Sequence, residues 1–421
     1  MAHLLVVESW VGSMSRLLPR ALREAGHEFT FLTRDLHHYL RSAPEGTAHP
    51  LLGARNVLTA DTNDIETLLP YVERLHGLLA FDGVLTSCDY YLPAVARIAA
   101  HLGLPGPGAE AVEHACRKDA TRRVLAAAAV PGPRFAVHEE WADLTRAAAE
   151  IGYPLVAKPV DLCAGMFVRR VDDEAELAAA VRALADFPVN ARGQRRAPAV
   201  LLEELLDGPE VSVETVSHAG AVQVVGVTDK SVGGAPAFVE TGHMFPAALT
   251  PADTEAAEQT ALHALKALGL TDGVVAHTEI KLTSAGPRVV EVNPRPAGNR
   301  ITELVRHVTG IDLAAAFVDV SLGRAPDLRR TDTGLRSAAI GFLVPETTGT
   351  LQTLDADRPP HLPDTPHVLE VQLPEPGRTV RAAGSNNEYL GHVMTGDPDG
   401  LGARERAETL LAGLRAGLVI R

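Results

Sequence analysis

Two neighbouring segments carry acidic, amide and basic side chains at the two-residue spacing of β-strands. One is VVAHTEIKL at 274–282 and the other is RVVEVNPR at 288–295. Successive side chains point to opposite faces of a strand, so every second residue shares a face. The polar residues of this pattern are His277, Glu279 and Lys281 in the first segment and Glu291, Asn293 and Arg295 in the second. The spacing therefore predicts carboxylates, an amide and a guanidinium gathered on one face.

The turn TSAGP between these segments predicts a hairpin. A turn centred on Ala285 places Glu279 opposite Glu291, although a bulge would shift this register. Two facing carboxylates repel unless a cation lies between them, and Mg²⁺ takes such ligands together with substrate phosphates. Asn293 would add a neutral oxygen ligand, and Arg295 would direct its charge toward a transferred phosphate or an acyl phosphate. The alternative is a hairpin whose charges face water.

A lysine ends a short apolar strand in the segment YPLVAKP at 153–159. An ammonium group at this place, directly before a proline, suits an anion, and ATP phosphate is the anion that we expect Lys158 to bind. The alternative is a lysine that protects an exposed sheet edge from pairing.

A third segment, VLLEELLDGPEVSVE at 200–214, joins an apolar strand to an alternating strand through an acidic turn. Such a clamp would admit a flat ring. Backbone groups from Glu203 to Leu206 would hydrogen-bond adenine, and Glu210 would accept from ribose hydroxyls. The alternative is an ordinary hairpin with acidic residues on its surface.

The elements that would position these residues follow two patterns. Up to about residue 110, short apolar strands alternate with helical stretches, which is typical of a doubly wound parallel sheet. The first turn, ESWVGS, lacks the G-x-G-x-x-G fingerprint, so we expect no dinucleotide there. The turn-rich segment LPGPG at 104–108 predicts a boundary, and we expect units at 1–110, 111–330 and 331–421.

Composition narrows the class of protein. The chain has 421 residues and a net charge of −14, which argues against nucleic acid as a partner. Its three cysteines lack C-x-x-C spacing, so we expect reduced thiols rather than disulfides or a zinc site. There is neither a signal-peptide pattern nor an apolar run of about 18 residues. The sequence therefore predicts a cytoplasmic protein that does not span a membrane.

Together these segments resemble the ATP-grasp superfamily, and within it the L-amino-acid ligases. RKDATRRVL at 117–125, followed by VPGPRF at 130–135, is similar to the first ATP-binding lysine helix of the family. The resemblance implies ATP contacts from Lys118, Lys158, Glu203, Leu206 and Glu210, and metal contacts from Glu279, Glu291 and Asn293. It also implies that Arg295 stabilises the acyl phosphate and the tetrahedral intermediate.

The resemblance extends to further residues and to the architecture. It makes His243, in VETGHMFP, a contact near the phosphates and the substrate, and Arg300 a contact to a substrate carboxylate. The alternatives are a buried or surface histidine at a strand end and an arginine that begins a helix. The loop after Lys158 has one glycine, so SVGG at 231–234 is the alternative cover for the phosphates. The implied fold is α/β, with α+β character in the ATP-grasp part. It comprises a Rossmann-like pre-ATP-grasp domain, a lid at about 120–205, a core, and a closing domain.

The function that this resemblance implies is ATP-dependent ligation of a small-molecule carboxylate to an amine through an acyl phosphate. Mg²⁺ is the expected metal, with Mn²⁺ as a substitute, and a homodimer is the implied assembly. Lys158, Arg295 and His243 are the expected catalytic residues. One alternative is a carboxylase or nucleotide-biosynthesis ligase that activates bicarbonate or formate. Another is an ATP-binding protein without catalysis.

Overall fold

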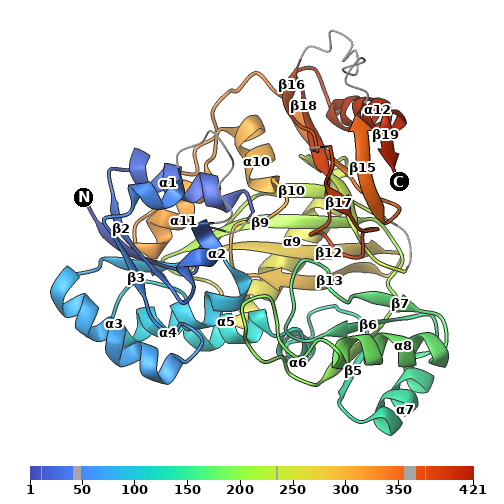
Figure 1. Ribbon diagram of the computed structural model, residues 1–421, viewed down its shortest axis with the longest axis horizontal. Coiled ribbons are helices and arrows are strands. Elements are labelled where there is room, and N and C mark those ends of the chain that lie inside the picture. Colours follow the sequence, from blue (N-terminus) through green and yellow to red (C-terminus); the bar gives the residue numbers. More distant parts are fainter. Residues whose placement is uncertain (11, 41–48, 234–235, 355–366, 375) are drawn as a thin grey trace.

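The computed structural model describes residues 1–10, 12–40, 49–233, 236–354, 367–374 and 376–421. Three α/β units surround a long central sheet (Figure 1). The N-terminal unit lies on the left of this view, a small lid on the lower right, and the C-terminal unit on the upper right. Within the described residues, no helix is long and apolar enough to cross a membrane.

The N-terminal unit is a parallel sheet covered by helices, as the sequence predicts. Its strand order is β3-β2-β1-β4, and all three pairings are parallel. The strands are β1 (His3–Val7), β2 (Glu28–Thr33), β3 (Asn56–Thr59) and β4 (Gly83–Leu85). The helices are α1 (Met14–Glu24), α2 (Leu36–Leu40), α3 (Ile65–Leu79) and α4 (Leu92–Leu102), with short 3₁₀ turns η1 (Pro50–Gly53) and η2 (Asp89–Tyr91). The strand β1 is buried on both faces, which is typical of a parallel sheet.

The central sheet has eight strands in the order β13-β12-β9-β10-β11-β14-β18-β16. Five come from the middle of the chain: β9 (Glu210–His218), β10 (Ala221–Val232), β11 (Glu240–Phe245), β12 (Val274–Thr283) and β13 (Gly286–Asn293). Three come from the C-terminal part: β14 (Ser337–Leu343), β16 (Val368–Gln372) and β18 (Gly391–Asp397). The C-terminal part therefore extends the central sheet, which the sequence did not indicate.

Helices cover both faces of the central sheet. On one face, α9 (Pro251–Leu268) packs its Ala257 and Ala261 against Val211 and Ile280 of the sheet. On the other face lie α10 (Ile301–Thr309) and α11 (Leu313–Ser321), which share a core with α1. Small alanines on α9 permit a close helix–sheet approach. The N-terminal unit and the central sheet are thus joined by one hydrophobic core.

The lid is a four-stranded antiparallel sheet in the order β5-β8-β6-β7. Its strands are β5 (Phe135–His138), β6 (Leu155–Pro159), β7 (Arg169–Val171) and β8 (Val200–Glu204), and its helices are α7 (Trp141–Ile151) and α8 (Glu174–Ala185). Leu144, Leu155, Leu177 and Leu202 form a core separate from that of the central sheet. The helices α5 (Ala109–Cys116) and α6 (Lys118–Ala127) pack on α9 and β13, and α6 also contacts the lid through Arg122 and Glu203.

The C-terminal unit completes the molecule with a small sheet and one helix. The sheet has the order β17-β15-β19, with β15 (Gly349–Leu354), β17 (Thr379–Val380) and β19 (Leu418–Ile420). The helix α12 (Ala403–Ala416) packs its Leu411 and Leu414 against this unit and the end of the central sheet.

Candidate active site

A cavity of about 660 Å³ lies where the N-terminal unit, the lid and the central sheet meet. This volume suits a small-molecule ligand. Residues of all three units line it, and so do Asn386 and Tyr389 of the C-terminal part. Of the sequence-predicted site residues, the cavity wall includes Lys118, Lys158, Glu203, Leu206, Glu210, Glu279, Glu291, Asn293 and Arg295. These predicted residues, which lie up to 177 positions apart between Lys118 and Arg295, are therefore brought to one place.

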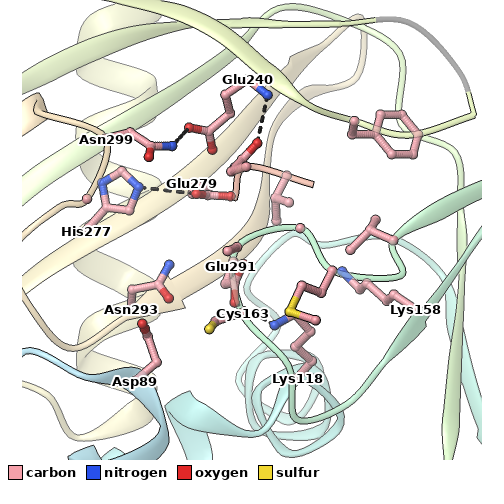
Figure 2. A pocket seen from close by; sticks show the side chains of 18 of the residues that line it. Asp89, Lys118, Lys158, Cys163, Glu240, His277, Glu279, Glu291, Asn293 and Asn299 are labelled. Carbon is pink, nitrogen blue, oxygen red and sulfur yellow. Dashed lines mark hydrogen bonds and ion pairs between the residues drawn. The ribbon is translucent and has the colours of Figure 1, made fainter. Parts of the chain in front are cut away.

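The predicted hairpin forms, with the predicted register. Glu279 of β12 pairs with Glu291 of β13, and a bulge follows directly between Glu279 and Ile280. Asn293 pairs with His277 on the same two strands and is buried. Figure 2 shows Glu279, Glu291 and Asn293 directed toward the same cavity. The alternative of a hairpin facing open water is therefore wrong.

Lys230 of β10 holds three carboxylates next to this hairpin. Its Nζ lies 2.7 Å from Glu279, 2.9 Å from Glu210 and 3.1 Å from Glu240, and its side chain is only 1% exposed. Burial opposes the charged form of Glu279, but Lys230 outweighs this effect and lowers the pKa of Glu279. One ammonium group and three carboxylates thus share a buried cluster, in which Lys230 offsets part of the repulsion between the carboxylates.

His277 supports the same cluster from β12. Its Nδ1 lies 3.0 Å from Oε1 of buried Glu214. On its other side, Nε2 lies 3.2 Å from Oε1 of Glu279, and Figure 2 shows this contact. Burial disfavours the imidazolium, but the carboxylates of Glu214 and Glu279 outweigh burial and raise the pKa of His277 to about 9. The charged imidazole therefore fixes the direction in which the Glu279 carboxylate points.

The two predicted ATP lysines enter the cavity from different units. Lys118, at the start of α6, donates to Glu291 Oε1 and to the Leu162 carbonyl, both at 2.7 Å. Burial opposes its charge, but Glu291 outweighs burial, so the pKa of Lys118 is raised. Lys158 lies on β6 of the lid. Lys118 thus contacts the loop that follows β6, and Lys158 lies at the end of β6 just before that loop.

Lys158 and its partner Glu203 form a buried charge group within the lid. Lys158 Nζ lies 2.7 Å from Glu203 Oε2, and Arg122 Nε donates to Glu203 Oε1 at 2.5 Å. Burial opposes ionisation of Glu203, but Arg122 and Lys158 outweigh burial and lower the pKa of Glu203 to about 2. Burial lowers the pKa of Lys158, and Glu203 offsets only part of this effect. The Glu203 carboxylate is thus occupied by two cations.

The expected adenine clamp is a hinge between two sheets. The strand β8, which contains Glu203, pairs with β5 and β6 of the lid, while β9 starts at Glu210 in the central sheet. The two strands do not pair with each other among the described strands, so the alternative of an ordinary hairpin is wrong. Leu206 follows the end of β8 and lines the cavity. Gly234, in the alternative phosphate-covering segment, lies outside the described residues.

Arg295 lies beyond the hairpin and contacts the N-terminal unit. Its Nε donates to Asp89 Oδ1 at 2.6 Å, and its Nη1 donates to the Pro296 carbonyl at 3.1 Å. Burial opposes the charge, but Asp89 outweighs burial and raises the pKa of Arg295. The guanidinium is therefore held in one orientation at the cavity wall.

Two predicted substrate contacts are not part of the cavity wall. Arg300 pairs with Glu303 at 2.8 Å and with Glu370, so its charge is used in a contact between α10 and β16. His243 is buried and its Nε2 lies 3.0 Å from Glu240 Oε2. It lines a separate cavity between the central sheet and α12. His243 thus contacts the main cavity only through its partner Glu240. Neither partner of Arg300 lines that cavity.

Sequence reasoning missed Glu240, Lys230, Asp89 and Asn299 as individual site residues. Glu240 lines the cavity and accepts from Asn299 Nδ2 (Figure 2). It also pairs with Lys230. One signal was available: Lys230 is one of only five lysines in the chain and occurs in a strand. The pairings of Glu240 and Asp89 join residues 59 and 206 positions apart, which no local pattern reveals.

Three family models match the chain. The ATP-grasp domain matches residues 151–303, the ATP-grasp N-terminal domain matches residues 20–106, and L-amino acid ligase C-terminal domain 2 matches residues 341–419. The uncharacterized protein y4rH of Sinorhizobium fredii (strain NBRC 101917 / NGR234) is 31% identical over 395 residues, covering 92% of this chain and 79% of that protein. The chain belongs to the ATP-grasp family. Enzymes of this family generally use ATP and Mg²⁺.

Other relatives of this ATP-grasp chain differ in length. Human carnosine synthase 1 is 29% identical over 334 residues, and the match covers 75% of this chain but only 39% of that protein. The solved structure of an L-amino acid ligase from Bacillus licheniformis has a TM-score of 0.79 and 24% identity, covering 100% of this chain and 98% of that one. The structural likeness shows the shared fold over the whole chain.

The cavity residues fit a hard divalent cation. Glu279, Glu291 and Asn293 offer oxygen atoms from adjacent strands, and Mg²⁺ commonly combines one or two carboxylates with substrate phosphates. The described residues contain no group of three or more His, Cys, Asp and Glu side chains arranged to hold a metal by themselves. A metal here would therefore be bound jointly by the protein and by the phosphates of a nucleotide.

Proposed function

We propose that this chain is an ATP-dependent ligase that joins the carboxylate of one amino acid to the amine of another. The observation that carries the proposal is a single cavity lined by Glu279, Glu291, Asn293, Lys118 and Arg295. Family membership, the match to an L-amino acid ligase C-terminal domain, and the names of the relatives support the same conclusion.

The nucleotide would lie across the hinge between the lid and the central sheet. Lys118 and Lys158 would bind phosphate oxygens, because both ammonium groups reach the cavity from neighbouring elements. Backbone groups near Leu206 would bind adenine, and Glu210 would accept from the ribose hydroxyls. Glu203 would hold Lys158 and Arg122 in place rather than contact the nucleotide with its side chain.

Glu279, Glu291 and Asn293 would hold Mg²⁺, or Mn²⁺ as a substitute, which supplies positive charge to the phosphates when bound. Around them the protein positions the reactants. Lys118 and Lys158 would keep the γ-phosphate in line with the incoming carboxylate, which is the main contribution an enzyme makes to phosphoryl transfer. Closure of the lid over the cavity would exclude water from the intermediate.

The proposed reaction has two steps. A carboxylate oxygen of the first substrate attacks the γ-phosphorus and ADP leaves, which gives an acyl phosphate. The amine of the second substrate then attacks the acyl carbon, loses a proton, and expels phosphate with one former carboxylate oxygen. Negative charge develops on the acyl oxygen in this second step. Arg295, oriented by Asp89, is placed to stabilise it.

Glu240 favours amino-acid substrates over bicarbonate or formate. Its carboxylate lines the cavity, shares the Lys230 ammonium with two other carboxylates, and is positioned by His243 and Asn299. A carboxylate in this place suits the ammonium group of an amino acid, which bicarbonate and formate lack. In this proposal His243 is a positioning residue for Glu240, and Arg300 has no role in substrate binding. The domain boundaries, a cytoplasmic location and a homodimer stay predictions from the sequence.

Phosphate release from ATP tests the proposal. We expect release to depend on Mg²⁺ and on a pair of amino acids, with a product whose mass equals the two amino acids minus water. Stimulation by bicarbonate or formate alone would favour the carboxylase or nucleotide-biosynthesis alternative. Nucleotide binding without phosphate release in any carboxylate and amine mixture would favour a non-catalytic protein.

A further inference from the structure

Arg192 differs from the other cations of the cavity. Among the described residues, six lysines and arginines line the wall. Five of them have a carboxylate partner: Lys118 with Glu291, Lys158 and Arg122 with Glu203, Lys281 with Glu210, and Arg295 with Asp89. Within the described part of the chain, Arg192 has no such ion pair. Glu8 acts on the half-buried guanidinium only from beyond Tyr39, and an anionic ligand in the cavity would give Arg192 a direct ion pair.

The side chain of Arg192 rests on Tyr39 of the N-terminal unit. Its Nη1 donates to the Tyr39 hydroxyl at 3.3 Å, and its guanidinium carbon lies 5.4 Å from the centre of the Tyr39 ring. The Tyr39 hydroxyl in turn donates to Glu8 at 2.7 Å. Glu8 also accepts from Thr33, Thr62 and the Arg34 backbone amide, so its carboxylate is already fully engaged. A guanidinium has five N–H donors, so Arg192 keeps donors for a ligand.

The backbone of the Arg192 loop is fixed between the lid and the N-terminal unit. The Arg192 carbonyl accepts from Asn63 Nδ2 at 2.9 Å and from Arg34 Nη2 at 3.1 Å. Gln194 of the same loop donates to the Tyr90 carbonyl at 3.2 Å. The loop therefore carries a cation from the lid side to the wall formed by the N-terminal unit. A cation held in this way is pre-organised for an anion and loses little entropy on binding it.

The proposed chemistry needs an anion site of this kind. The amino acid that supplies the amine carries a carboxylate of its own, which does not react and stays charged throughout both steps. If that carboxylate reached the γ-phosphate, it would compete with the correct one. Lys118 and Lys158 pair with groups of the central sheet and the lid, whereas Arg192 contacts the N-terminal unit. The unreacting carboxylate would thus have a cation separate from the phosphate-binding lysines.

We infer that Arg192 binds the α-carboxylate of the amine-supplying amino acid and so selects amino acids over simple amines as the second substrate. The inference rests on the proposed ligase function. A planar guanidinium matches a carboxylate with two parallel hydrogen bonds, which a lysine does not reproduce.

The test compares Arg192→Gln with wild type, using an amino acid and the corresponding amino-acid amide as amine substrates. In the variant we expect KM for the amino acid to rise about 10- to 100-fold, because a charge-assisted hydrogen-bond pair between Arg192 and the substrate carboxylate is lost. KM for the amide, for ATP and for the first substrate should stay within about twofold of wild type. Arg192→Lys should recover part of the loss. Arg34→Gln is the matched control, because Arg34 holds the same loop through a backbone carbonyl; it should leave the preference for acid over amide unchanged.

Two results would overturn the inference. One is an equal rise in KM for the amino acid and its amide in Arg192→Gln, and the other is the same loss of preference in Arg34→Gln, which would make the loop structural. If Arg192→Gln does not fold, the Arg192→Lys variant decides by the same ratio of KM values. A wild-type protein that ligates no amino acids would reject the proposed function itself, whereas normal wild-type ligation with no change in preference would reject only the role of Arg192.

Discussion

Glu279 and Glu291 are paired residues on β12 and β13, yet each carboxylate contacts a different lysine. Glu279 contacts Lys230 and Glu291 contacts Lys118, both at 2.7 Å. The two facing carboxylates therefore coexist because each contacts a cation, one from α6 and one from β10. Both remain on the wall of the cavity, where they can accept further positive charge.

Glu291→Gln should abolish turnover. The change removes the negative charge of a proposed metal ligand and the ion-pair partner of Lys118. We therefore expect kcat to fall by at least about 100-fold and ATP binding to lose its dependence on Mg²⁺. Phosphate release and nucleotide binding measured across a Mg²⁺ titration would check this. Glu255→Gln, on the exposed side of α9, should behave as wild type. Normal turnover of Glu291→Gln would remove this residue from the metal site.

Arg295→Ala should slow ligation without weakening ATP binding. Because Arg295 is expected to stabilise charge that develops only during reaction, its loss should lower kcat by about 100- to 1,000-fold while the Kd for ATP changes little. Asp89→Asn keeps the guanidinium and removes only the group that orients it, so it should cost less. The comparison needs single-turnover ligation rates and ATP titrations. Equal losses in both variants, or a loss of ATP binding in Arg295→Ala, would speak against this role.

Lys230→Met should destabilise the fold. The substitution leaves Glu210, Glu240 and Glu279 close together without their shared cation, and breaking a buried charge group in this way typically costs about 3–5 kcal/mol. Urea unfolding would measure the change. Lys266→Met on the exposed face of α9 is the control and should lie within about 0.5 kcal/mol of wild type. A stability loss below about 1 kcal/mol would mean that the cluster does not need this ammonium group.

The free energy of unfolding should fall in acid because Glu203 becomes protonated. Its pKa is lowered from 4.5 to about 2 in the folded chain, so its contribution is complete above about pH 4.5 and is lost as the pH falls toward 2. The full effect is on the order of 3 kcal/mol, since one pKa unit corresponds to about 1.4 kcal/mol. We expect Glu203→Gln to be less stable than wild type at pH 6 and to show a flatter dependence on pH between 5 and 3.

Unfolding free energies of both proteins at several pH values would check this prediction. Glu204→Gln is the matched control, because Glu204 is adjacent in sequence but pairs with the exposed Arg134 and should contribute at most about 1 kcal/mol. A constant difference between wild type and Glu203→Gln from pH 6 to pH 3 would contradict the account of its pKa.

Local patterns in the sequence predicted the hairpin well. The hairpin is visible in a stretch of about twenty residues, as two alternating segments around a short turn. The turn has two residues, and the bulge between Glu279 and Ile280 then brings Glu279 opposite Glu291. The parallel N-terminal sheet was also predictable, because its strands and helices alternate in regular lengths.

Contacts between distant segments could not be predicted in the same way. Lys230 meets its carboxylates only because β9, β11 and β12 lie near β10 in the folded sheet, and no spacing in the chain encodes that order. The expected substrate contact of Arg300 is not supported, since its guanidinium is taken by Glu303 and by Glu370 from a strand 70 positions away. The addition of β14, β16 and β18 to the central sheet is a long-range pairing of the same kind.

The transfer of an oxygen atom from the carboxylate substrate to phosphate tests the central claim most directly. Wild-type protein is incubated with ATP, Mg²⁺ and two amino acids, of which the one that supplies the reacting carboxylate is labelled with ¹⁸O in that carboxylate. The mass of the released phosphate is then measured. An acyl-phosphate ligase must deliver one ¹⁸O to each phosphate and form the amide in equal amount. Phosphate that carries no ¹⁸O, or that forms without an amide product, would contradict the account.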